Sequence, residues 1–362
     1  MTKLIAMYLP QYHEIPENNK WWGKGHTEWV NCKKAVPFSK THYQPKVPLN
    51  KEYYNLLDEK FQERQNKLAN DYVIYGFCYY HYWFEGKLLL EKPMENMLKN
   101  KKISNKFCIS WANHSWINKY EKKNRKLLIE QTYGGVEDWV KHFDYLLQFF
   151  KDDRYIKVDG KPMLVIYDAK SINCWEKMKK IWDDLANKNG LPGIYYVNTL
   201  KIYKDIEESN KGGFDAQFEY QPALSTSPSN NIFSYQTLYN LKRIIYRDYL
   251  NKPAKFNYDH VWSEIFKNTP NNLKTYLGAF VDWDVTSRWG SRGLYYTGCT
   301  EQKFYKYLKK QVDRSKAMNS DYIFITAWNE WSEGAYLEPD EKHKFNFLEC
   351  IKKLYDSGVE NE

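Results

Sequence analysis

Short runs of apolar residues, separated by polar and turn-forming segments, recur along the whole chain. Most are continuously apolar or β-branched, which is typical of parallel strands that are buried on both faces. The pattern predicts eight strands, at Leu4–Leu9, Ile74–Tyr80, Phe107–Trp111, Met163–Tyr167, Ile194–Val197, Phe214–Phe218, Tyr276–Val281 and Tyr322–Trp328.

Between many of these runs, apolar positions return at spacings of three and four, the period of an amphipathic helix. One such stripe is formed by Trp139, Phe143, Leu146, Leu147 and Phe150. Further helices are predicted at Glu52–Asp71, at Trp175–Asn187, around Phe304–Val312 and around Phe347–Leu354. Eight strands alternating with helices favour an α/β fold of the (β/α)8 type, a TIM barrel, over an open doubly wound sheet.

Two connections are too long for plain turns. One follows the first predicted strand, at about residues 13–50, and the other follows the sixth, at about residues 220–274. Long connections in compact domains are usually functional, and both follow strand ends, which places them at the C-terminal face of a barrel. We therefore expect a single barrel domain over residues 1–362 with these two insertions.

The composition excludes several classes of protein. With 362 residues, of which 43% are hydrophobic, the chain is not expected to be disordered. The net charge of +9 comes with two basic runs, Lys99–Lys106 and Lys119–Lys126. We interpret them as solvated surface and predict no nucleic-acid partner. No apolar segment approaches the roughly 18 residues that a membrane span requires.

The cysteines and the N-terminal segment give indications of the cellular compartment. Six cysteines are scattered without a CxxC pair, which fits a reducing environment better than a disulfide framework. The first apolar run, Leu4–Leu9, is closed by Pro10 and is too short for the apolar core of a signal peptide. We expect a cytoplasmic location.

Aromatic residues make up 18% of the chain, and many follow directly on the predicted strands. Catalytic groups of a barrel project from these carboxyl ends. Flat rings interleaved with hydrogen-bonding groups suit a carbohydrate, although each ring alone is equally compatible with capping the core. The candidates for substrate binding are Tyr8, Gln11, Tyr80, His81, Trp83, Trp111, Asn113, Tyr167, Asp284, Trp328, Asn329 and Trp331.

Two glutamates after the eighth predicted strand are the candidate catalytic residues. Glu330 and Glu333 lie three residues apart, with Trp331 between them and Gly334 after them. A regular strand would direct them to opposite faces, whereas a turn that begins near Asn329 would let both reach one cavity. Glycoside cleavage needs such a pair, one carboxylic acid and one carboxylate. The alternative is a pair of exposed loop glutamates.

No pattern indicates a metal or another cofactor. The histidines show no HxxxH or HxH spacing, and GxSxG, the signature of serine hydrolases, is absent. The segment Asp282–Asp284 (DWD) resembles the DxD of many metal-dependent sugar transferases, but three letters carry little specificity. We predict no cofactor and no metal site.

At these residues the chain resembles a known family. The resemblance to the WbsX-type polysaccharide-biosynthesis family is carried by five motifs: Tyr8–His13 (YLPQYH), Trp22–Trp29 (WGKGHTEW), His42–Pro45 (HYQP), Gly76–Phe84 (GFCYYHYWF) and Ala327–Pro339 (AWNEWSEGAYLEP). Members occur with polysaccharide and O-antigen genes and are often labelled glycosyltransferases. The family is itself similar to glycoside hydrolase family 99, the retaining endo-α-mannosidases and mannanases.

This resemblance implies a barrel and assigns roles to the two glutamates. In family 99 the NEWxEG motif holds both catalytic carboxylates, which correspond here to Glu330 and Glu333. Glu330 would deprotonate the sugar 2-hydroxyl, which attacks C1 to give a 1,2-anhydro sugar. Glu333 would act as the general acid and then as the base for water. The motifs add Glu28, Trp29 and Glu338 to the substrate-binding candidates.

Two departures from the family pattern concern neighbouring positions. His114 stands where the family commonly has a glutamate, and His26 stands where it has a phenylalanine. Both leave the glutamate pair intact and affect the predicted choice of sugar.

Three functions remain open on the sequence. The first is a glycoside hydrolase that retains configuration at an α-linked sugar of a bacterial polysaccharide or O-antigen-type glycan. The second is a glycosyltransferase, and the third is a non-catalytic glycan-binding barrel. In each case the partner is an oligosaccharide or polysaccharide, and the sequence does not define the oligomeric state.

Overall fold

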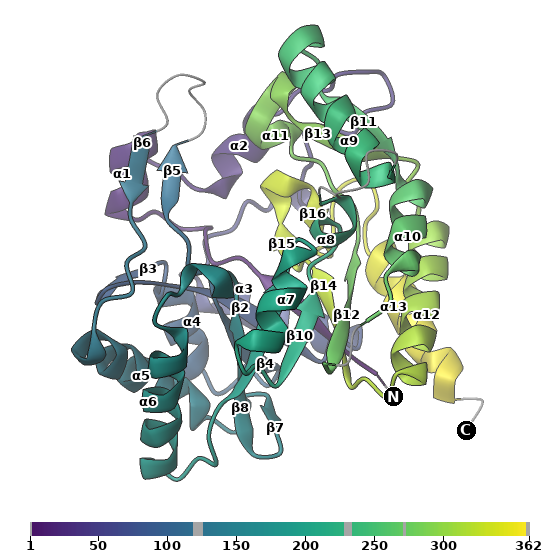
Figure 1. The fold of residues 1–362 in the computed structure, drawn as a ribbon. Helices are drawn as coiled ribbons and strands as arrows, with labels where there is room; N and C mark the ends of the chain where they lie inside the picture. Colours follow the sequence, from purple (N-terminus) through teal and green to yellow (C-terminus); the bar gives the residue numbers. More distant parts are fainter. Residues whose placement is uncertain (1, 119–125, 228–233, 271–272, 360–362) are drawn as a thin grey trace.

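A closed barrel of parallel strands forms the centre of the molecule. The computed structural model describes residues 2–118, 126–227, 234–270 and 273–359. Within them, eight parallel strands pair in the order β1-β14-β12-β10-β9-β8-β4-β2, and β2 pairs with β1 to close the ring (Figure 1). The strands are β1 (Lys3–Tyr8), β2 (Gly76–Phe84), β4 (Lys106–Trp111), β8 (Lys161–Ile166), β9 (Tyr195–Leu200), β10 (Ala216–Glu219), β12 (Thr275–Phe280) and β14 (Tyr322–Thr326).

The predicted strands and the predicted (β/α)8 barrel are confirmed. Each of the eight apolar runs overlaps one barrel strand, and nearly every residue of these strands is buried. The second strand differs most, because it continues four residues past its predicted end at Tyr80 to Phe84. There it pairs antiparallel with β3 (Lys87–Leu89) in a hairpin. The continuation decides where the side chains of residues 81–84 point.

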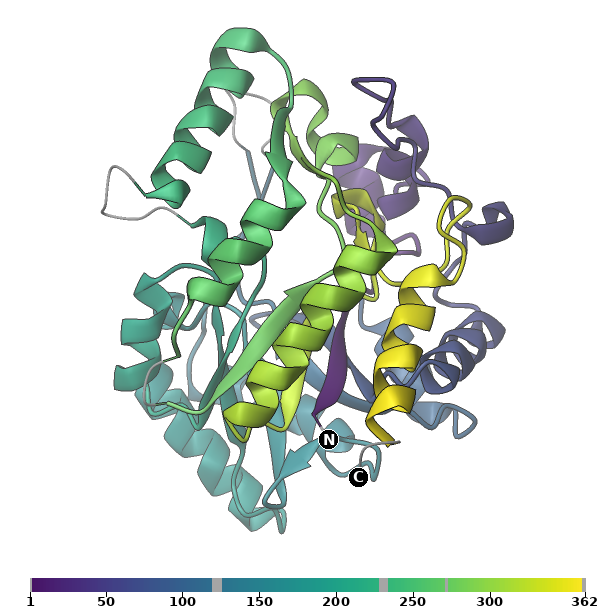
Figure 2. The same cartoon turned by 90° about the vertical axis from the view of Figure 1, so that its right-hand side faces the viewer.

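Helices surround the barrel, and α12 and α13 pack side by side on its outside (Figure 2). The helices that were predicted from periodicity are present, but Glu52–Asp71 was predicted too long. The helix begins only at Glu59, because Asp58 caps it by accepting a hydrogen bond from the Lys60 N–H at 3.0 Å. The outer helices are α3 (Glu59–Asp71), α4 (Lys92–Lys99), α5 (Val136–Phe150), α6 (Trp175–Lys188), α7 (Lys204–Lys211), α10 (Tyr258–Lys267), α12 (Glu301–Ala317) and α13 (Asn346–Val359).

The two long connections contain secondary structure of their own and lie beyond the carboxyl ends of the strands, at the top of Figure 1. The first contains α1 (Pro16–Trp22), α2 (Glu28–Lys34) and the turn η1 (Leu49–Lys51). The second contains α8 (Ala223–Thr226), α9 (Tyr235–Ile244), its continuation η3 (Ile245–Leu250) and β11 (Ala254–Asn257), before α10. Pairing of β11 with β13 (Leu294–Thr297) joins the second connection to the segment after β12.

Short elements complete the described residues. They are the hairpin of β5 (Trp116–Asn118) with β6 (Lys126–Ile129), β7 (Lys157–Val158), η2 (Ala169–Ser171), α11 (Thr286–Trp289), η4 (Gly290–Arg292), β15 (Asn329–Glu330), η5 (Trp331–Glu333) and β16 (Ala335–Tyr336). The basic run predicted at Lys119–Lys126 lies, apart from Lys126, outside the described residues. No helix in the described part of the chain is both long and apolar enough to span a membrane.

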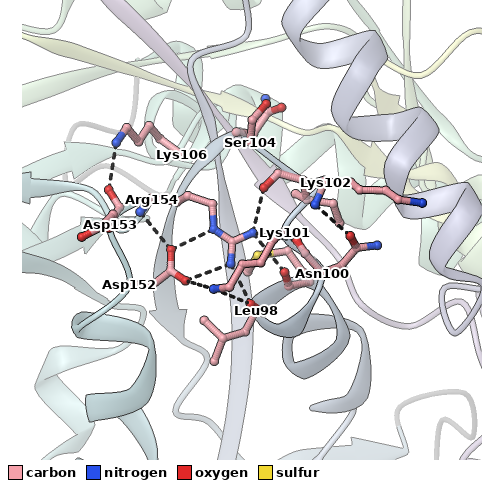
Figure 3. Close-up of polar contacts among 12 residues, drawn as sticks. Leu98, Asn100, Lys101, Lys102, Ser104, Lys106, Asp152, Asp153 and Arg154 are labelled. Atoms are coloured by element: carbon pink, nitrogen blue, oxygen red, sulfur yellow. Dashed lines mark hydrogen bonds and ion pairs between the residues drawn. The ribbon is translucent and has the colours of Figure 1, made fainter.

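One arginine, Arg154, connects the end of α4 with the turn before β4 (Figure 3). The Arg154 guanidinium donates to the carbonyls of Leu98 and Ile103 at 2.8 Å each, and to those of Met97 and Asn100 at 3.1 Å. It also pairs with Asp152 at 2.8 Å. A single, largely covered cation therefore satisfies the carbonyls at the end of α4 and fixes the turn before β4.

We expect Arg154→Met to lower the free energy of unfolding by about 2–4 kcal/mol, because it leaves several carbonyls without their donor and removes the guanidinium that pairs with Asp152. Denaturant titration followed by circular dichroism measures this change. The control is Lys141→Met, which removes an exposed ion pair with Glu137 and should change stability by less than about 0.5 kcal/mol. Equal effects of the two substitutions would contradict this account of Arg154.

Candidate active site

The two candidate catalytic glutamates are placed by a tight turn after the eighth barrel strand. Glu330 ends the two-residue strand β15, and Glu333 ends the turn η5 that follows. The chain then reverses at Gly334, which has a φ of +63°. A Cβ atom at this position would lie 2.7 Å from the Asp284 Cβ, so only glycine fits. Because of this turn, Glu330 and Glu333 do not follow the alternation of a regular strand. Their carboxyls lie near enough for the charge of Glu333 to raise the pKa of Glu330.

Asn329 anchors this turn to the end of the first strand. Its side chain accepts a hydrogen bond from the Leu9 N–H at 2.7 Å and donates to the Leu9 carbonyl at 3.0 Å. The Tyr12 hydroxyl donates to the Asn329 carbonyl and accepts from the Trp331 N–H. Asn329 is fully buried, so it acts here as a support for Glu330.

An arginine links Glu333 to the first insertion. Arg288, in α11, contacts the Glu333 carboxylate and also donates to Glu28 at 3.0 Å. Ser332 accepts a hydrogen bond from the Arg288 Nε at 3.1 Å and donates to Glu28. Glu28 is the first residue of α2 and is buried. The guanidinium thus bridges two carboxylates from distant parts of the chain.

Aromatic packing holds α2 over this network. The Trp29 ring lies 5.4 Å from the Trp331 ring and 4.7 Å from the Tyr12 ring, centroid to centroid. Its Nε1 donates to the Tyr54 carbonyl at 2.8 Å. Trp29 and Trp331 are both buried, so they position Glu28 and the turn that holds Glu330 and Glu333.

Four tyrosines lie around the glutamate pair: Tyr80 and Tyr82 in β2, Tyr167 directly after β8 and Tyr220 directly after β10. The hydroxyls of Tyr80 and Tyr220 are 3.1 Å apart, and the Tyr167 ring lies 6.1 Å and 5.9 Å from their rings. The Tyr82 hydroxyl accepts from Gln11 at 3.2 Å. These residues supply hydroxyls and ring faces next to the carboxylates, as a sugar site requires.

Burial governs the protonation of the pair. It raises the pKa of Glu330, and the nearby charge of Glu333 raises it further, while Arg288 and a hydrogen bond from Tyr80 oppose the shift. Burial also raises the pKa of Glu333, against the opposing charge of Arg288. Two adjacent buried carboxyls resist simultaneous ionisation, so the pair retains a proton to higher pH than exposed glutamates would.

Several predicted substrate-binding residues are instead engaged inside the protein. The His81 Nε2 lies 2.9 Å from the His142 Nε2, and Trp83 stacks on His142 and donates to Asp138 at 3.1 Å. Because β2 continues to Phe84, its side chains alternate, and these two contact α5 on the outside of the barrel. We therefore do not expect His81 or Trp83 to contact a substrate.

Asp284 and Glu338 are also buried and bonded to protein groups. Asp284 accepts from His42 and Gln44 at 2.8 Å each and from the Thr286 N–H at 2.9 Å. Glu338 accepts from Gln65, Tyr54 and Trp331 at 2.6–2.7 Å. Four more of the predicted substrate-binding residues are buried. Tyr8 is hydrogen-bonded to Gln65, Asn113 is hydrogen-bonded to the backbone of Asp168, and Trp111 and Trp328 are core rings.

Sequence reasoning did not single out three residues that contact the site. Tyr82 lies in β2 and would be found by treating residues 81–84 as part of that strand. Tyr220 directly follows β10, which ends at Glu219. Arg288 lies eight residues beyond β12, in a segment whose path depends on the contact of α11 with α2. No local pattern in the sequence indicates its role.

The chain is similar to proteins of one family and to solved glycoside hydrolase-like structures. A family model described as Glycosyltransferase WbsX matches residues 4–351. Two proteins from Xanthomonas campestris pv. campestris, both named "Uncharacterized protein WxcX", are 29% and 30% identical over 355 and 360 residues. Each alignment covers 97% of this chain and 49% of the relative, so the chain spans about half the length of the curated relatives it matches.

Two solved structures share the fold over nearly the whole chain. The GH99 endo-α-mannosidase from Bacteroides thetaiotaomicron superposes with a TM-score of 0.59 at 13% identity, covering 99% of this chain and 97% of that one. A structure described as a glycoside hydrolase-like protein gives a TM-score of 0.61 at 10% identity, covering 98% and 94%. At these identities the likeness concerns the architecture of the barrel.

Proposed function

The chain belongs to the WbsX glycosyltransferase family, as its motifs predicted, and on that premise we propose that it is a carbohydrate-active enzyme that cleaves an α-glycosidic bond with retention of configuration. The substrate would be a bacterial polysaccharide or an O-antigen-type glycan. The observation that carries the proposal is the placement of Glu330 and Glu333 in one turn, beside four tyrosines and Arg288. Acid-base cleavage of a glycoside needs two such carboxyl groups next to the bound sugar.

In the proposed reaction Glu330 removes the proton of the sugar 2-hydroxyl while that oxygen attacks C1. The bond from C1 to the leaving oxygen breaks, and Glu333 delivers its proton to that oxygen. Glu333 then removes a proton from water, which opens the 1,2-anhydro sugar at C1, and Glu330 returns its proton to O2. Two inversions at C1 give net retention. A 2-hydroxyl trans to the leaving group is required.

The roles need a charged Glu330 and a protonated Glu333. Tyr80 favours the charged form of Glu330 through its hydrogen bond, whereas Arg288 favours the charged form of Glu333. The contact between Arg288 and Glu333 therefore opposes the role of Glu333 as an acid. We propose that bound substrate separates Arg288 from Glu333 and leaves Arg288 on Glu28, so that the shared proton moves to Glu333.

Replacement of Arg288 by Met should therefore shift the alkaline limb of the kcat/KM profile to higher pH. Arg288 lowers the pKa of Glu333, so its loss raises that pKa and keeps the acid protonated over a wider range. The measurement is a pH–rate profile of both proteins. A limb that moves to lower pH, or does not move, would contradict the assignment of Glu333 as the acid under the influence of Arg288.

A glycosyltransferase is the second candidate, because the family carries that description. Its main support in the sequence is the segment Asp282–Asp284. The Asp282 carboxylate pairs with Lys46 at 3.0 Å, and Asp284 is occupied by His42, Gln44 and Thr286. Both oxygens of Asp284 are thus held by protein donors, which leaves Asp282 Oδ1 as the one oxygen of the pair without a donor in the described part of the chain. A metal with a nucleotide diphosphate needs several such oxygens, so the hydrolase remains our first proposal.

The experiment that separates the two offers the protein a panel of α-linked oligosaccharides and, in parallel, nucleotide sugars with acceptor glycans and Mn²⁺. Mass spectrometry detects cleavage or transfer. We expect new reducing ends from one or more oligosaccharides and none with a Glu330→Gln/Glu333→Gln variant. Metal-dependent transfer without cleavage would overturn the proposal in favour of the transferase.

A further inference from the structure

An exposed apolar face lies on the helical segment that α9 forms with its continuation η3, residues 235–250. In Figures 1 and 2 this segment, drawn in green, forms the upper edge of the molecule. Six of the fifteen large apolar side chains that are exposed in the described part of the chain lie within it. Tyr249 is 81% exposed, and the others are 40–56% exposed: Leu238, Leu241, Ile244, Ile245 and Leu250. Such clustering of apolar surface is typical of a contact site.

The opposite face of the segment holds it on the protein. The Tyr239 ring stacks on the Phe256 ring at 3.8 Å between centroids, and Gln236 donates to Glu264 at 3.2 Å. The exposed apolar side chains are therefore not needed to fix the segment. A surface helix normally presents polar residues to solvent on its outer face. Here four apolar residues instead follow one another at intervals of three and four, along one stripe: Leu238, Leu241, Ile245 and Tyr249.

Positive charge accompanies this apolar stripe. Residues 235–255 contain five cationic side chains and one acidic one. The acidic one, Asp248, forms a bidentate pair with Arg247, so this pair adds no net charge. Lys242 and Arg243 donate to neutral groups, a backbone carbonyl and an asparagine side chain, which leaves both charged. The segment thus keeps a net positive charge, from Lys242, Arg243, Lys252 and Lys255.

Two of these lysines flank the apolar stripe directly. Lys242 comes four residues after Leu238 and three before Ile245, and Lys252 comes three residues after Tyr249. An apolar stripe flanked by long cationic side chains is typical of helices that lie in a membrane interface. Their apolar side chains enter the headgroup boundary, and their cations reach the lipid phosphates. We propose that the α9–η3 segment docks this protein on a membrane surface that contains anionic lipids.

Docking would bring the candidate active site close to the membrane. The inner side of the same segment contributes Tyr239 and Asn240 to the wall of a cavity of about 550 Å³, which Glu333 also lines. A membrane on the outer face therefore lies about the thickness of one helix away from this cavity. The proposal goes beyond the proposed function and does not depend on it, because docking requires no glycan.

The test is sedimentation of the whole chain with vesicles of phosphatidylcholine alone and of phosphatidylcholine with about one third phosphatidylglycerol. The variant Leu241→Ser/Ile245→Ser interrupts the stripe, and the control Leu57→Ser/Val136→Ser removes side chains of similar exposure elsewhere. At low salt we expect the wild type to bind the anionic vesicles at least about tenfold more tightly than the neutral ones. The variant should weaken this binding at least about tenfold, and the control less than about twofold.

A second variant tests the charge separately. Lys242→Gln/Lys252→Gln leaves the apolar stripe intact and should weaken binding to the anionic vesicles at least about fivefold. All the substituted side chains of the stripe and the control are exposed, so each of these proteins should unfold at nearly the wild-type temperature, as measured by circular dichroism.

Absence of binding to the anionic vesicles at low salt would overturn the proposal, as would equal binding to both kinds of vesicle or equal weakening by the stripe variant and its control. Sedimentation velocity without lipid tests the other occupant, a second copy of the chain. We expect the wild type and Leu241→Ser/Ile245→Ser to sediment alike. A wild-type dimer that this variant converts to a monomer would assign the face to a second copy instead. None of these measurements involves a glycan, so their outcome is independent of the glycan-cleavage experiment.

Discussion

Replacement of Glu333 by Gln is expected to reduce kcat/KM on natural glycosides by about 10²–10⁴-fold, the contribution of a positioned general acid. The variant cannot protonate the leaving oxygen, so the loss should be much smaller on a dinitrophenyl glycoside, whose leaving group needs no proton. On that substrate the second step becomes limiting, because water lacks its base. Steady-state kinetics on matched pairs of glycosides measures both effects.

Azide provides the decisive control for this variant. As an anionic nucleophile it needs no base, so it should restore turnover of the dinitrophenyl glycoside by Glu333→Gln and give a glycosyl azide of retained configuration. Glu137→Gln, on an exposed position of α5, should behave as the wild type. Turnover of natural glycosides by Glu333→Gln at the wild-type rate would refute its role as the acid.

The second large effect is expected for Glu330→Gln. Because Glu330 acts at the 2-hydroxyl and not at the leaving group, kcat/KM should fall by about 10²–10⁴-fold on good and poor leaving groups alike. Azide should not rescue it, since the anhydro sugar on which azide acts is not formed. A substrate without the 2-hydroxyl should likewise fail with the wild-type protein.

The comparison of the two variants separates the roles. If the effect of Glu330→Gln depended on the leaving group and that of Glu333→Gln did not, Glu330 would be the acid and Glu333 the base. The structure makes this a sharp comparison, because Glu330 is the more deeply buried carboxyl and Arg288 contacts Glu333. Burial alone would favour the proton on Glu330.

The barrel was predictable because parallel strands covered on both faces leave continuous apolar runs in the sequence. The runs Leu4–Leu9 and Tyr322–Trp328 follow this pattern, and they contain the first and last barrel strands, which pair with each other. A turn that begins near Asn329 was predicted because two candidate carboxylates lie three residues apart, and the structure has a turn there. The start of α3 was misjudged because Asp58, a cap, was included in the helix.

Side-chain directions and long-range contacts were harder to predict from the sequence. His81 and Trp83 were interpreted as residues after a strand, whereas hydrogen bonding with β3 extends the strand and turns them outward. Glu338 belongs to a conspicuous motif, but its partner Gln65 lies in α3, and only the tertiary structure brings them together. The same holds for Arg288, whose contact with Glu28 joins segments 260 residues apart.

The most direct test of the central claim is the configuration of the first product, followed by ¹H NMR immediately after the protein is added to a cleavable α-linked oligosaccharide. Two inversions at C1, driven by Glu330 and Glu333, predict that the α-anomer appears first and that the β-anomer follows only by mutarotation. Initial release of the β-anomer, or α-product formed at an undiminished rate by the Glu330→Gln/Glu333→Gln variant, would contradict the account.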